Sequence, residues 1–318
     1  MGKQSSISVV IPNYCGQSLL EKYLPYLLSA LNSSKQVSSY EVIIVDDASL
    51  DNSVTFLETF YPNILLLQNE KNVGFSQTIN KGIFAATKNF IFVLNNDMLV
   101  TEGLFDTLLI PFSTKENVFG VFPMIKDMEG TKILEAQKLP KETCCKIHYK
   151  DNKEQKELSY SFYLCGGAAL IDREKLILLG GFSTIYSPFY FEDFDLSLRA
   201  WKNDWKSYYD PDAFCYHCHS ATVNGLDKKY VREIYIRNSL IFNYLFLEEY
   251  KVMLFFVSIC VKCIVRTHHR KTFLRAVSSA FLMRNILRKM KLDDRKKNVL
   301  SLREVVEKYF SLNKNSLH

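Results

Sequence analysis

The chain has 318 residues, of which 47% are hydrophobic and 23% are charged, with 12 Gly and 8 Pro. This is the composition of a globular protein, and it excludes collagen-like, low-complexity and largely disordered chains. The length predicts one large domain, or one large and one small domain. The chain opens with MGKQSS directly before an apolar segment, unlike a secretory signal peptide, and its eight cysteines are unevenly spaced. We therefore expect a reduced, cytoplasmic protein without a disulfide framework.

The net charge of +6 is distributed unevenly along the chain. Residues 228–318 hold 20 Lys or Arg and 7 Asp or Glu, a net charge of +13, whereas residues 1–227 carry a net charge of −7. No apolar run reaches the length of about 18 residues that a membrane-spanning helix needs. These patterns predict a catalytic or binding body at 1–227 and a basic, helical region at 228–318, suited to nucleic acid or to an anionic membrane surface.

The first hundred residues alternate short apolar runs with amphipathic segments. The runs, bounded by polar residues, are typical of buried strands, and the segments between them have helical spacing. Strands are predicted at 8–12, 41–46, 64–68 and 90–95, and helices at 19–31, 52–60 and 75–86. This alternation predicts an α/β fold with a mostly parallel sheet covered by helices.

The pattern changes after the first hundred residues. Residues 126–160 are polar and predict an excursion that covers a substrate cleft, and Gly166-Gly167 allows close approach of the backbone. Residues 190–201 predict a loop that opens a helix with carboxylates in its first turn, where the helix dipole favours anions. Everything from residue 230 onward is expected to be helical and basic.

Polar residues follow three of the predicted strands. In parallel α/β sheets, ligands bind beyond the carboxyl ends of the strands, so these residues predict a site on one edge of the sheet. They are Pro12-Asn13-Tyr14, Asp46-Asp47 and Asn95-Asn96-Asp97.

A series of motifs in fixed order resembles glycosyltransferase family 2, in particular the bacterial rhamnosyltransferase-type enzymes that build surface polysaccharides. The motifs are SVVIPNY, VIIVDDASLDNS, NEKNVGFSQTINKGI, FVLNNDM, CGGAALIDREKL, GGF, FEDFDLSLR and YDPDAFCYHCHS, which together span about residues 7–220. The resemblance implies the GT-A fold. It also implies inverting transfer of a sugar, rhamnose from dTDP being one candidate, from a dTDP-, UDP- or GDP-sugar to a glycan or lipid-linked acceptor.

The resemblance assigns nucleotide binding to residues of the first four motifs. Asp47 is expected to accept a hydrogen bond from the base or ribose, and Tyr14 to stack on the base. The alternatives are that Asp47 caps the helix near Asn52 and that Tyr14 is an ordinary loop aromatic, while Asp46 is expected to be structural. The predicted nucleotide-binding residues are Pro12, Tyr14, Asp47, Gly74, Asn80, Asn95 and Asn96, of which Gly74 and Asn80 either line the pocket or shape a helix start.

Asp97 is the only acid in LNND, where the family's DxD-type motif places its metal-binding carboxylate. Asn95 replaces the first acid of that motif, which should weaken metal binding. The resemblance adds His217 as a second ligand, with His219 as the alternative, for Mg²⁺ or Mn²⁺. The alternative to a metal-binding role is that NND is only a polar turn after a strand.

The resemblance places the catalytic base at Asp193, with Glu192 orienting the acceptor. Asp195 lies four residues before Arg199 and is expected to form an intrahelical ion pair.

Three rival hypotheses remain open at this stage. The spacing of the paired cysteines Cys215/Cys218 and Cys260/Cys263 is similar to that of the ligands of a structural zinc site. The chain is alternatively a non-catalytic nucleotide or nucleic-acid binder with a basic tail, although we expect an enzyme with no nucleic-acid partner. The basic helices are predicted to hold the protein on the cytoplasmic membrane face, or else to pack on protein. Cys144-Cys145 has no assigned role.

Overall fold

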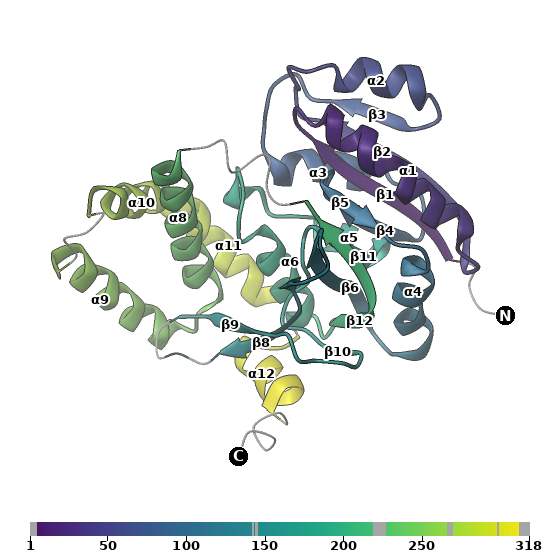
Figure 1. Cartoon of the computed structure of the whole chain (residues 1–318). Coiled ribbons are helices and arrows are strands. Elements are labelled where there is room, and N and C mark those ends of the chain that lie inside the picture. Colours follow the sequence, from purple (N-terminus) through teal and green to yellow (C-terminus); the bar gives the residue numbers. More distant parts are fainter. Residues whose placement is uncertain are drawn as a thin grey trace.

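The computed structural model describes residues 5–141, 143, 146–218, 227–265, 270–297 and 299–311. Its centre is a mixed sheet with the order β3-β2-β1-β4-β11-β6-β12-β10, in which β5 also pairs with β12 and β7 with β6, and β8 and β9 form a separate hairpin (Figure 1). The strands are β1 (Ser5–Asn13), β2 (Val37–Asp46), β3 (Leu65–Gln68), β4 (Phe90–Leu94), β5 (Met98–Val100), β6 (Val118–Asp127), β7 (Ile133–Glu135), β8 (Gln137–Lys141), β9 (His148–Asn152), β10 (Ser159–Tyr160), β11 (Ala168–Asp172) and β12 (Lys206–His217).

Strands β1 to β4 are parallel to one another in the sheet, and β6 is parallel to β12. Strand β11 runs antiparallel between these two blocks. The helices are α1 (Gln17–Ser33), α2 (Ser53–Phe60), α3 (Phe75–Ala85), α4 (Leu104–Thr114), α5 (Arg173–Leu178), α6 (Glu192–Lys202), α8 (Lys228–Phe246), α9 (Glu249–Val265), α10 (Arg270–Leu282), α11 (Arg284–Lys297) and α12 (Leu302–Phe310). The α/β fold and the seven early elements predicted from the sequence are confirmed.

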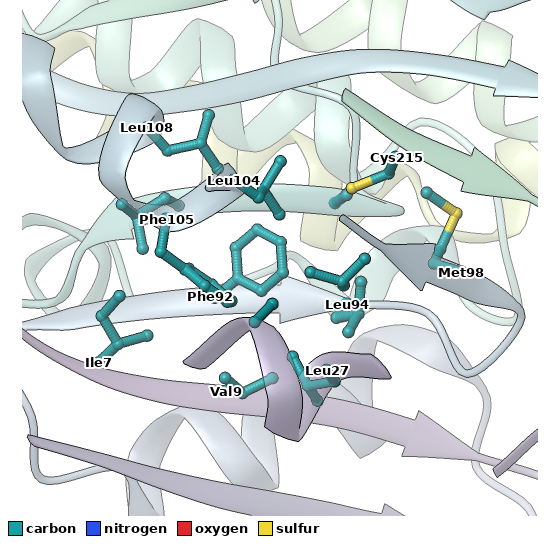
Figure 2. Close-up of a cluster of buried hydrophobic side chains, with 14 of the residues drawn as sticks. Ile7, Val9, Leu27, Phe92, Leu94, Met98, Leu104, Phe105, Leu108 and Cys215 are labelled. Atoms are coloured by element: carbon teal, nitrogen blue, oxygen red, sulfur yellow. The ribbon is translucent and has the colours of Figure 1, made fainter. Parts of the chain in front are cut away.

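Helices cover both faces of the sheet, which explains the unbroken apolar runs of its strands. On one face, α1 and α4 pack against β1 and β4, where the ring of Phe105 meets that of Phe92 at 5.1 Å (Figure 2). On the other face, α3, α5 and α6 pack against the alternate side chains of the same strands. The carboxyl ends of β1, β2 and β4 lie at the same edge of the sheet, because these strands are parallel.

The basic C-terminal region is attached to the body by a third core of aromatic side chains. Phe242 of α8 stacks on Phe194 of α6 with ring centroids 4.3 Å apart, and Phe310 of α12 contacts Trp201 at 5.3 Å. Helices α9 and α10 lie farther from the sheet (Figure 1). Part of the region therefore packs on the body, as one alternative expected, and part stands away from it.

Candidate active site

The ends of β1, β2 and β4 are joined by a polar network. The Asp46 carboxylate accepts hydrogen bonds from Asn13 Nδ2 at 3.0 Å and from the Ser49 amide at 2.9 Å. Asn13 Oδ1 accepts in turn from Asn96 Nδ2 at 2.8 Å. A Cβ on Gly16 would lie 2.2 Å from that amide, so only glycine allows this approach. Asp46 has a structural role, as expected, and Asn96 belongs to the same network.

Asp47 is buried and organises the loop before α3. Its Oδ1 accepts from the Val73 amide at 2.9 Å, and its Oδ2 accepts from the Gly74 amide at 2.9 Å. The α2 N-terminus is instead bound by Asp51, whose Oδ1 accepts from the Ser53 amide at 3.1 Å. The alternative of Asp47 as a helix cap is therefore wrong, whereas its contact with a base or ribose stays a prediction.

Gly74 and Asn80 connect α3 to the segment before the predicted base. Gly74 has a φ of +82°, and a Cβ there would lie 3.0 Å from the backbone of Pro188. Asn80 donates from Nδ2 to the Phe182 carbonyl at 2.7 Å and accepts from the Phe182 amide at 2.8 Å. Both residues thus shape the wall of the site. A direct contact of either with a nucleotide stays a prediction.

Pro12 and Tyr14 lie at the end of β1. Pro12 is paired with Val45 of β2, and Tyr14 follows the strand with 37% of its surface exposed. An exposed aromatic ring at this edge is compatible with stacking on a base.

Asp97 and His217 are brought together by the pairing of β5 with β12. Asp97 directly precedes β5, whose Met98 lies opposite His217. Asp97 Oδ2 is 3.1 Å from His217 Nε2, and its carbonyl accepts from the Cys218 amide at 2.9 Å. Asp97 Oδ1 is buried and has no hydrogen-bond partner within the described chain. The NND segment is thus a turn whose acid contacts His217, and its role in metal binding stays a prediction.

These two side chains fit a divalent cation. Adjacent ligands of an octahedral cation, at about 2.1 Å from the metal, lie about 3 Å apart, which is the spacing of Asp97 Oδ2 and His217 Nε2. The buried, unpartnered Oδ1 leaves further acceptor capacity at the same place. The described residues contain no group of three or more His, Cys, Asp or Glu side chains suited to a metal. A cation would therefore need oxygens from its substrate, as Mg²⁺ commonly does. His219 lies outside the described residues.

Asp193 lies in the first turn of α6, against the Gly166-Gly167 turn. Its Oδ1 accepts from the Phe194 amide at 2.7 Å, and its Oδ2 is 3.4 Å from the Gly166 amide. A Cβ on Gly166 would lie 3.2 Å from Asp193 Cβ. The Asn95 amide donates to the Gly167 carbonyl at 2.9 Å. The glycine pair therefore sets the predicted base beside the strand end that carries Asp97.

Burial changes the ionisation of the two acids at the start of α6. Burial raises the pKa of Asp193 to about 6, against the opposing effect of the Phe194 and Gly166 amides. Burial, reinforced by the charge of Asp193, raises the pKa of Glu192 to about 8. Glu192 Oε2 is also buried without a partner among the described residues. Asp193 is thus suited to accept a proton near neutral pH, while Glu192 is largely protonated there.

A buried lysine beside the base was not predicted from the sequence. Lys138 forms ion pairs with Glu135 and Asp151, and its ammonium lies 5.3 Å from the Tyr149 ring and 5.5 Å from the Tyr163 ring. All of these residues come from the polar excursion except Tyr163, which lies just after it, between β10 and β11. A lysine among alternating charges is typical of an exposed surface, so no sequence pattern predicted that Lys138 would be buried.

Two further residues hold the loop that leads to Asp193. Asn238 of α8 donates from Nδ2 to the carbonyls of Tyr186 and Phe189 at 2.6 and 2.9 Å, and Arg237 donates to the Ser187 carbonyl. Asn238 is fully buried at the helical spacing of Ile234 and Phe242. An asparagine on an otherwise apolar helix stripe was the available signal for this role.

Other expectations are also settled by the described chain. The intrahelical ion pair is confirmed, since Arg199 Nε is 2.9 Å from Asp195 Oδ1. Cys215 is buried in the apolar core with Leu94 and Leu170, which argues against a zinc site there. Cys144 and Cys145 lie outside the described residues.

Comparison with known proteins identifies relatives of this chain. Residues 8–179 match the family described as Glycosyl transferase family 2. The chain is 26% identical over 247 residues to N-acetylglucosaminyl-diphospho-decaprenol L-rhamnosyltransferase of Mycobacterium tuberculosis, covering 70% of this chain and 78% of that protein. It is 30% identical over 105 residues to glycosyltransferase GlyG of Streptococcus pneumoniae, covering 32% and 33% of the two chains.

Solved structures share the fold. GalNAc-T7, crystallised with UDP, GalNAc and Mn²⁺, superposes with a TM-score of 0.67 at 15% identity, covering 100% of this chain and 58% of that one. This chain thus spans little more than half of that protein. S. aureus TarS 1–349 with UDP gives a TM-score of 0.51 at 18% identity, covering 91% and 88%. The predicted GT-A fold is confirmed. Because the family match covers more than half of the chain, this protein belongs to glycosyl transferase family 2 and is a glycosyltransferase.

Proposed function

We propose that the protein transfers a sugar, with inversion, from a nucleotide diphosphate to a hydroxyl of a glycan or lipid-linked acceptor during cell-surface polysaccharide synthesis. The observation that carries this proposal is the placement of Asp193. Its half-buried carboxylate, with a pKa raised to about 6, is held by the glycine turn that also binds the strand end of Asp97. A base and a strand end that would hold a cation, on the two sides of one turn, suit a displacement at a carbon between them.

The proposed reaction is a single displacement. The acceptor hydroxyl gives its proton to the Asp193 carboxylate, and its oxygen forms a bond to the anomeric carbon. The bond from that carbon to the diphosphate oxygen breaks, and its electron pair leaves with the nucleoside diphosphate. Attack from the face opposite the leaving group inverts the configuration. Glu192, neutral at pH 7 because its pKa is raised to about 8, can donate a hydrogen bond without repelling the diphosphate.

A divalent cation would be held by Asp97 and His217 together with oxygens of the donor diphosphate. When bound, such a cation stabilises negative charge that develops on the departing diphosphate. GalNAc-T7 was crystallised with Mn²⁺, which supports the same requirement here. We propose that the remaining contacts with the donor are made by Tyr14, which would stack on the nucleobase, and by the loop that Asp47 organises.

The donor and acceptor are proposed from the relatives' names. The mycobacterial relative is named for L-rhamnose and for a diphospho-decaprenol acceptor, so we propose a rhamnosyl donor, with dTDP as the nucleotide, and a lipid-linked acceptor. Because S. aureus TarS was crystallised with UDP, UDP-sugars are included among the donors to be tested.

Hydrolysis of different nucleotide sugars by the purified protein distinguishes between the proposed donors and tests the need for a metal. The purified protein is incubated with dTDP-rhamnose, UDP-N-acetylglucosamine, UDP-galactose and GDP-mannose, each with Mn²⁺ or with EDTA, and nucleotide release is measured. We expect Mn²⁺-dependent release from one donor and none from the Asp193→Asn variant above background. If no donor is hydrolysed or bound, the proposed reaction is wrong.

We further propose that the protein lies on the cytoplasmic face of the membrane. No described helix is long and apolar enough to cross a membrane. On α9, however, exposed apolar side chains recur at helical spacing: Met253 at 73%, Val257 at 61% and Ile264 at 76% of their surface. Residues 251–292 contain no acid, and most of their lysines and arginines are exposed on α10 and α11. An apolar helix face beside basic helices is the pattern of interfacial binding to anionic lipid.

A further inference from the structure

An exposed pair of tyrosine rings lies beside the proposed base. Tyr190 lies three residues before Asp193 in the chain, and Tyr235 belongs to α8. The two side chains expose 37% and 53% of their surface. The Tyr190 ring meets the rings of Phe189 and Tyr235 at 5.0 and 6.0 Å, in both cases edge to face. Within the described chain no ring is stacked parallel on Tyr190, which leaves that position to a ligand.

The backbone holds Tyr190 in a conformation that such residues rarely adopt. Tyr190 has a φ of +75°, and Phe191 has a φ of +78°. Glycine, asparagine and aspartate enter this left-handed region most readily, so two successive aromatic residues there are strained. Strain of this kind persists only where the surrounding contacts over-determine it, and it is concentrated at functional sites. The placement of these two rings is therefore more than a consequence of local folding.

Two neighbouring elements fix the strained loop. Asn238 of α8 is fully buried, and its Nδ2 donates to the Tyr190 carbonyl at 3.0 Å. On the other side, the Phe75 amide at the start of α3 donates to the Pro188 carbonyl at 3.2 Å. Tyr190 is thus held between α8 and the loop that Asp47 organises, which we propose to contact the donor.

Glu192 adds a polar group beside the same ring. Burial raises the pKa of the Tyr190 phenol, and the negative charge that Glu192 and Tyr235 can carry raises it further, so these groups lie within reach of one another's charge. Glu192 Oε2 is buried and has no hydrogen-bond partner among the described residues. A ligand that lies flat on Tyr190 and carries a hydroxyl at its edge would satisfy both side chains.

A pyranose ring has this combination of groups. The C–H groups of its flat faces are attracted to the negative face of an aromatic ring, and its hydroxyls bond to carboxyl groups. We infer that Tyr190, flanked by Tyr235, stacks on a sugar ring of the acceptor and orients it so that one hydroxyl reaches Asp193. The inference rests on the proposed transfer reaction and names the residue that binds the acceptor's sugar. The nucleobase is assigned instead to Tyr14, at the end of β1.

Saturation-transfer difference NMR with the full chain tests the stacking, with methyl β-D-N-acetylglucosaminide as the probe. N-acetylglucosamine is part of the name of the mycobacterial relative. We expect the glycoside to bind, with more saturation on the axial protons of one ring face than on those of the other. N-acetylglucosaminitol, which has the acetamido group but an open chain, is the comparison and should bind about tenfold more weakly.

Substitutions separate stacking from folding. Tyr190→Asn removes the ring but keeps a residue that tolerates a positive φ, and it should weaken glycoside binding about tenfold or more. Tyr190→Phe keeps the ring and should retain the preference for one face of the sugar. Tyr235→Ala, on an exposed helix surface, should weaken binding several-fold. Tyr26→Ala is the matched control, a 52% exposed tyrosine on α1, and should bind normally.

Thermal unfolding shows whether each variant is folded. The inference is overturned if the glycoside does not bind, if the open-chain compound binds as well, or if Tyr190→Asn binds normally. If Tyr190→Asn is unfolded, normal binding by Tyr235→Ala overturns it. Displacement of the glycoside by dTDP would also overturn it, since the nucleobase would then lie on Tyr190. Glycoside binding without any donor hydrolysis by the wild-type protein would refute the proposed reaction alone, and donor hydrolysis without glycoside binding would refute this inference alone.

Discussion

At the scale of single residues, the ionisation of the proposed base Asp193 should set the pH range of activity. Burial raises the pKa of this carboxyl from its usual value of 3.8 to about 6. The proposed base acts only when deprotonated, so kcat/KM should fall about tenfold per pH unit below pH 6. It should be flat from there to about pH 8, above which Glu192 loses the proton with which it donates a hydrogen bond in the proposed reaction. An unperturbed aspartate would lose activity only near pH 4. A pH profile with its acidic midpoint near 4 would contradict the buried base.

The Asp193→Asn substitution tests the same residue directly. An amide cannot accept the acceptor's proton, so we expect turnover to fall by about 10²–10⁴-fold with unchanged nucleotide affinity. Steady-state kinetics and calorimetry with the nucleoside diphosphate measure the two quantities. Asp193→Glu should restore part of the rate, since it keeps a carboxylate. Near-normal turnover by the asparagine variant would remove Asp193 from the mechanism.

Asp97 should govern the metal dependence of donor binding. Asp97→Ala removes one of the two proposed protein ligands, and we expect Mn²⁺-dependent nucleotide affinity to fall about tenfold or more. The measurement is calorimetry with and without Mn²⁺. Asp212→Ala, an exposed acid on the same strand as His217, should bind normally. Equal affinity with and without Mn²⁺ in the wild-type protein would rule out the metal role.

At the scale of elements, the Gly166-Gly167 turn positions the proposed base, Asp193. Gly166→Ala would place a Cβ 3.2 Å from Asp193 Cβ, so the carboxylate must move by a few tenths of an ångström. We expect a loss of kcat of about 10²-fold, because small misplacements at the reacting centre are costly. Gly167→Ala is the neighbouring control, since its added Cβ would lie at an ordinary 3.4 Å from Asn95 Nδ2. Equal activities of the two variants would show that the turn does not position Asp193.

Lys138 connects the β8–β9 hairpin to the same site. Burial alone would lower the pKa of Lys138, but Glu135 and Asp151 outweigh it and raise the pKa above its usual range. Lys138→Met should destabilise the fold by about 2 kcal/mol, less than the 3–5 of a fully buried pair because both carboxylates are about one-third exposed.

The same variant removes a charge that lowers the pKa of Asp193. The acidic midpoint of kcat/KM should therefore move upward in Lys138→Met and stay in place in Lys150→Met. Urea unfolding and pH profiles measure the two effects. An unmoved midpoint would confine Lys138 to a role in stability.

The elements differ in how far sequence patterns could predict them. The first seven were predictable because buried strands and amphipathic helices leave periodic signals that depend only on local burial. The carboxylates and amides at the strand ends were predictable because topology alone brings them to one edge. The Glu135–Lys138–Asp151 cluster was not, because its burial comes from aromatic side chains distant in sequence. The role of Asp47 in holding Val73 and Gly74 likewise depends on loop geometry that no spacing reveals.

At the scale of the whole molecule, the exposed face of α9 should attach the protein to anionic membranes. We expect the full chain to float with vesicles containing anionic lipid at low salt and to be released at high salt, since each Lys or Arg near the surface contributes about 1 kcal/mol. Phe256→Asn/Val257→Asn should abolish flotation. Phe60→Asn, which changes an exposed ring on α2, should not. Flotation of all three proteins alike, or of none, would refute membrane attachment through α9.

A chain cut near Asp227 would be a poor substitute for these variants. Removing α8 and α12 would uncover Phe194 and Trp201, which they cover in the third core. Each large aromatic side chain returned to water costs about 1.5–3 kcal/mol. Such a fragment would lose stability and membrane affinity together, so the two effects could not be separated.

The grip of Arg237 and Asn238 on the loop before Asp193 also bears on protein engineering. Chimaeric enzymes are commonly made by joining the N-terminal part of one protein to the C-terminal part of another. The change in charge near residue 228 suggests a domain boundary at which such a junction would be placed. A junction there would keep the loop at 186–190 but replace the helix whose side chains hold its carbonyls. Chimaeras that exchange C-terminal regions to obtain new acceptors should therefore have their junction after Phe246. The catalytic body then keeps its own α8.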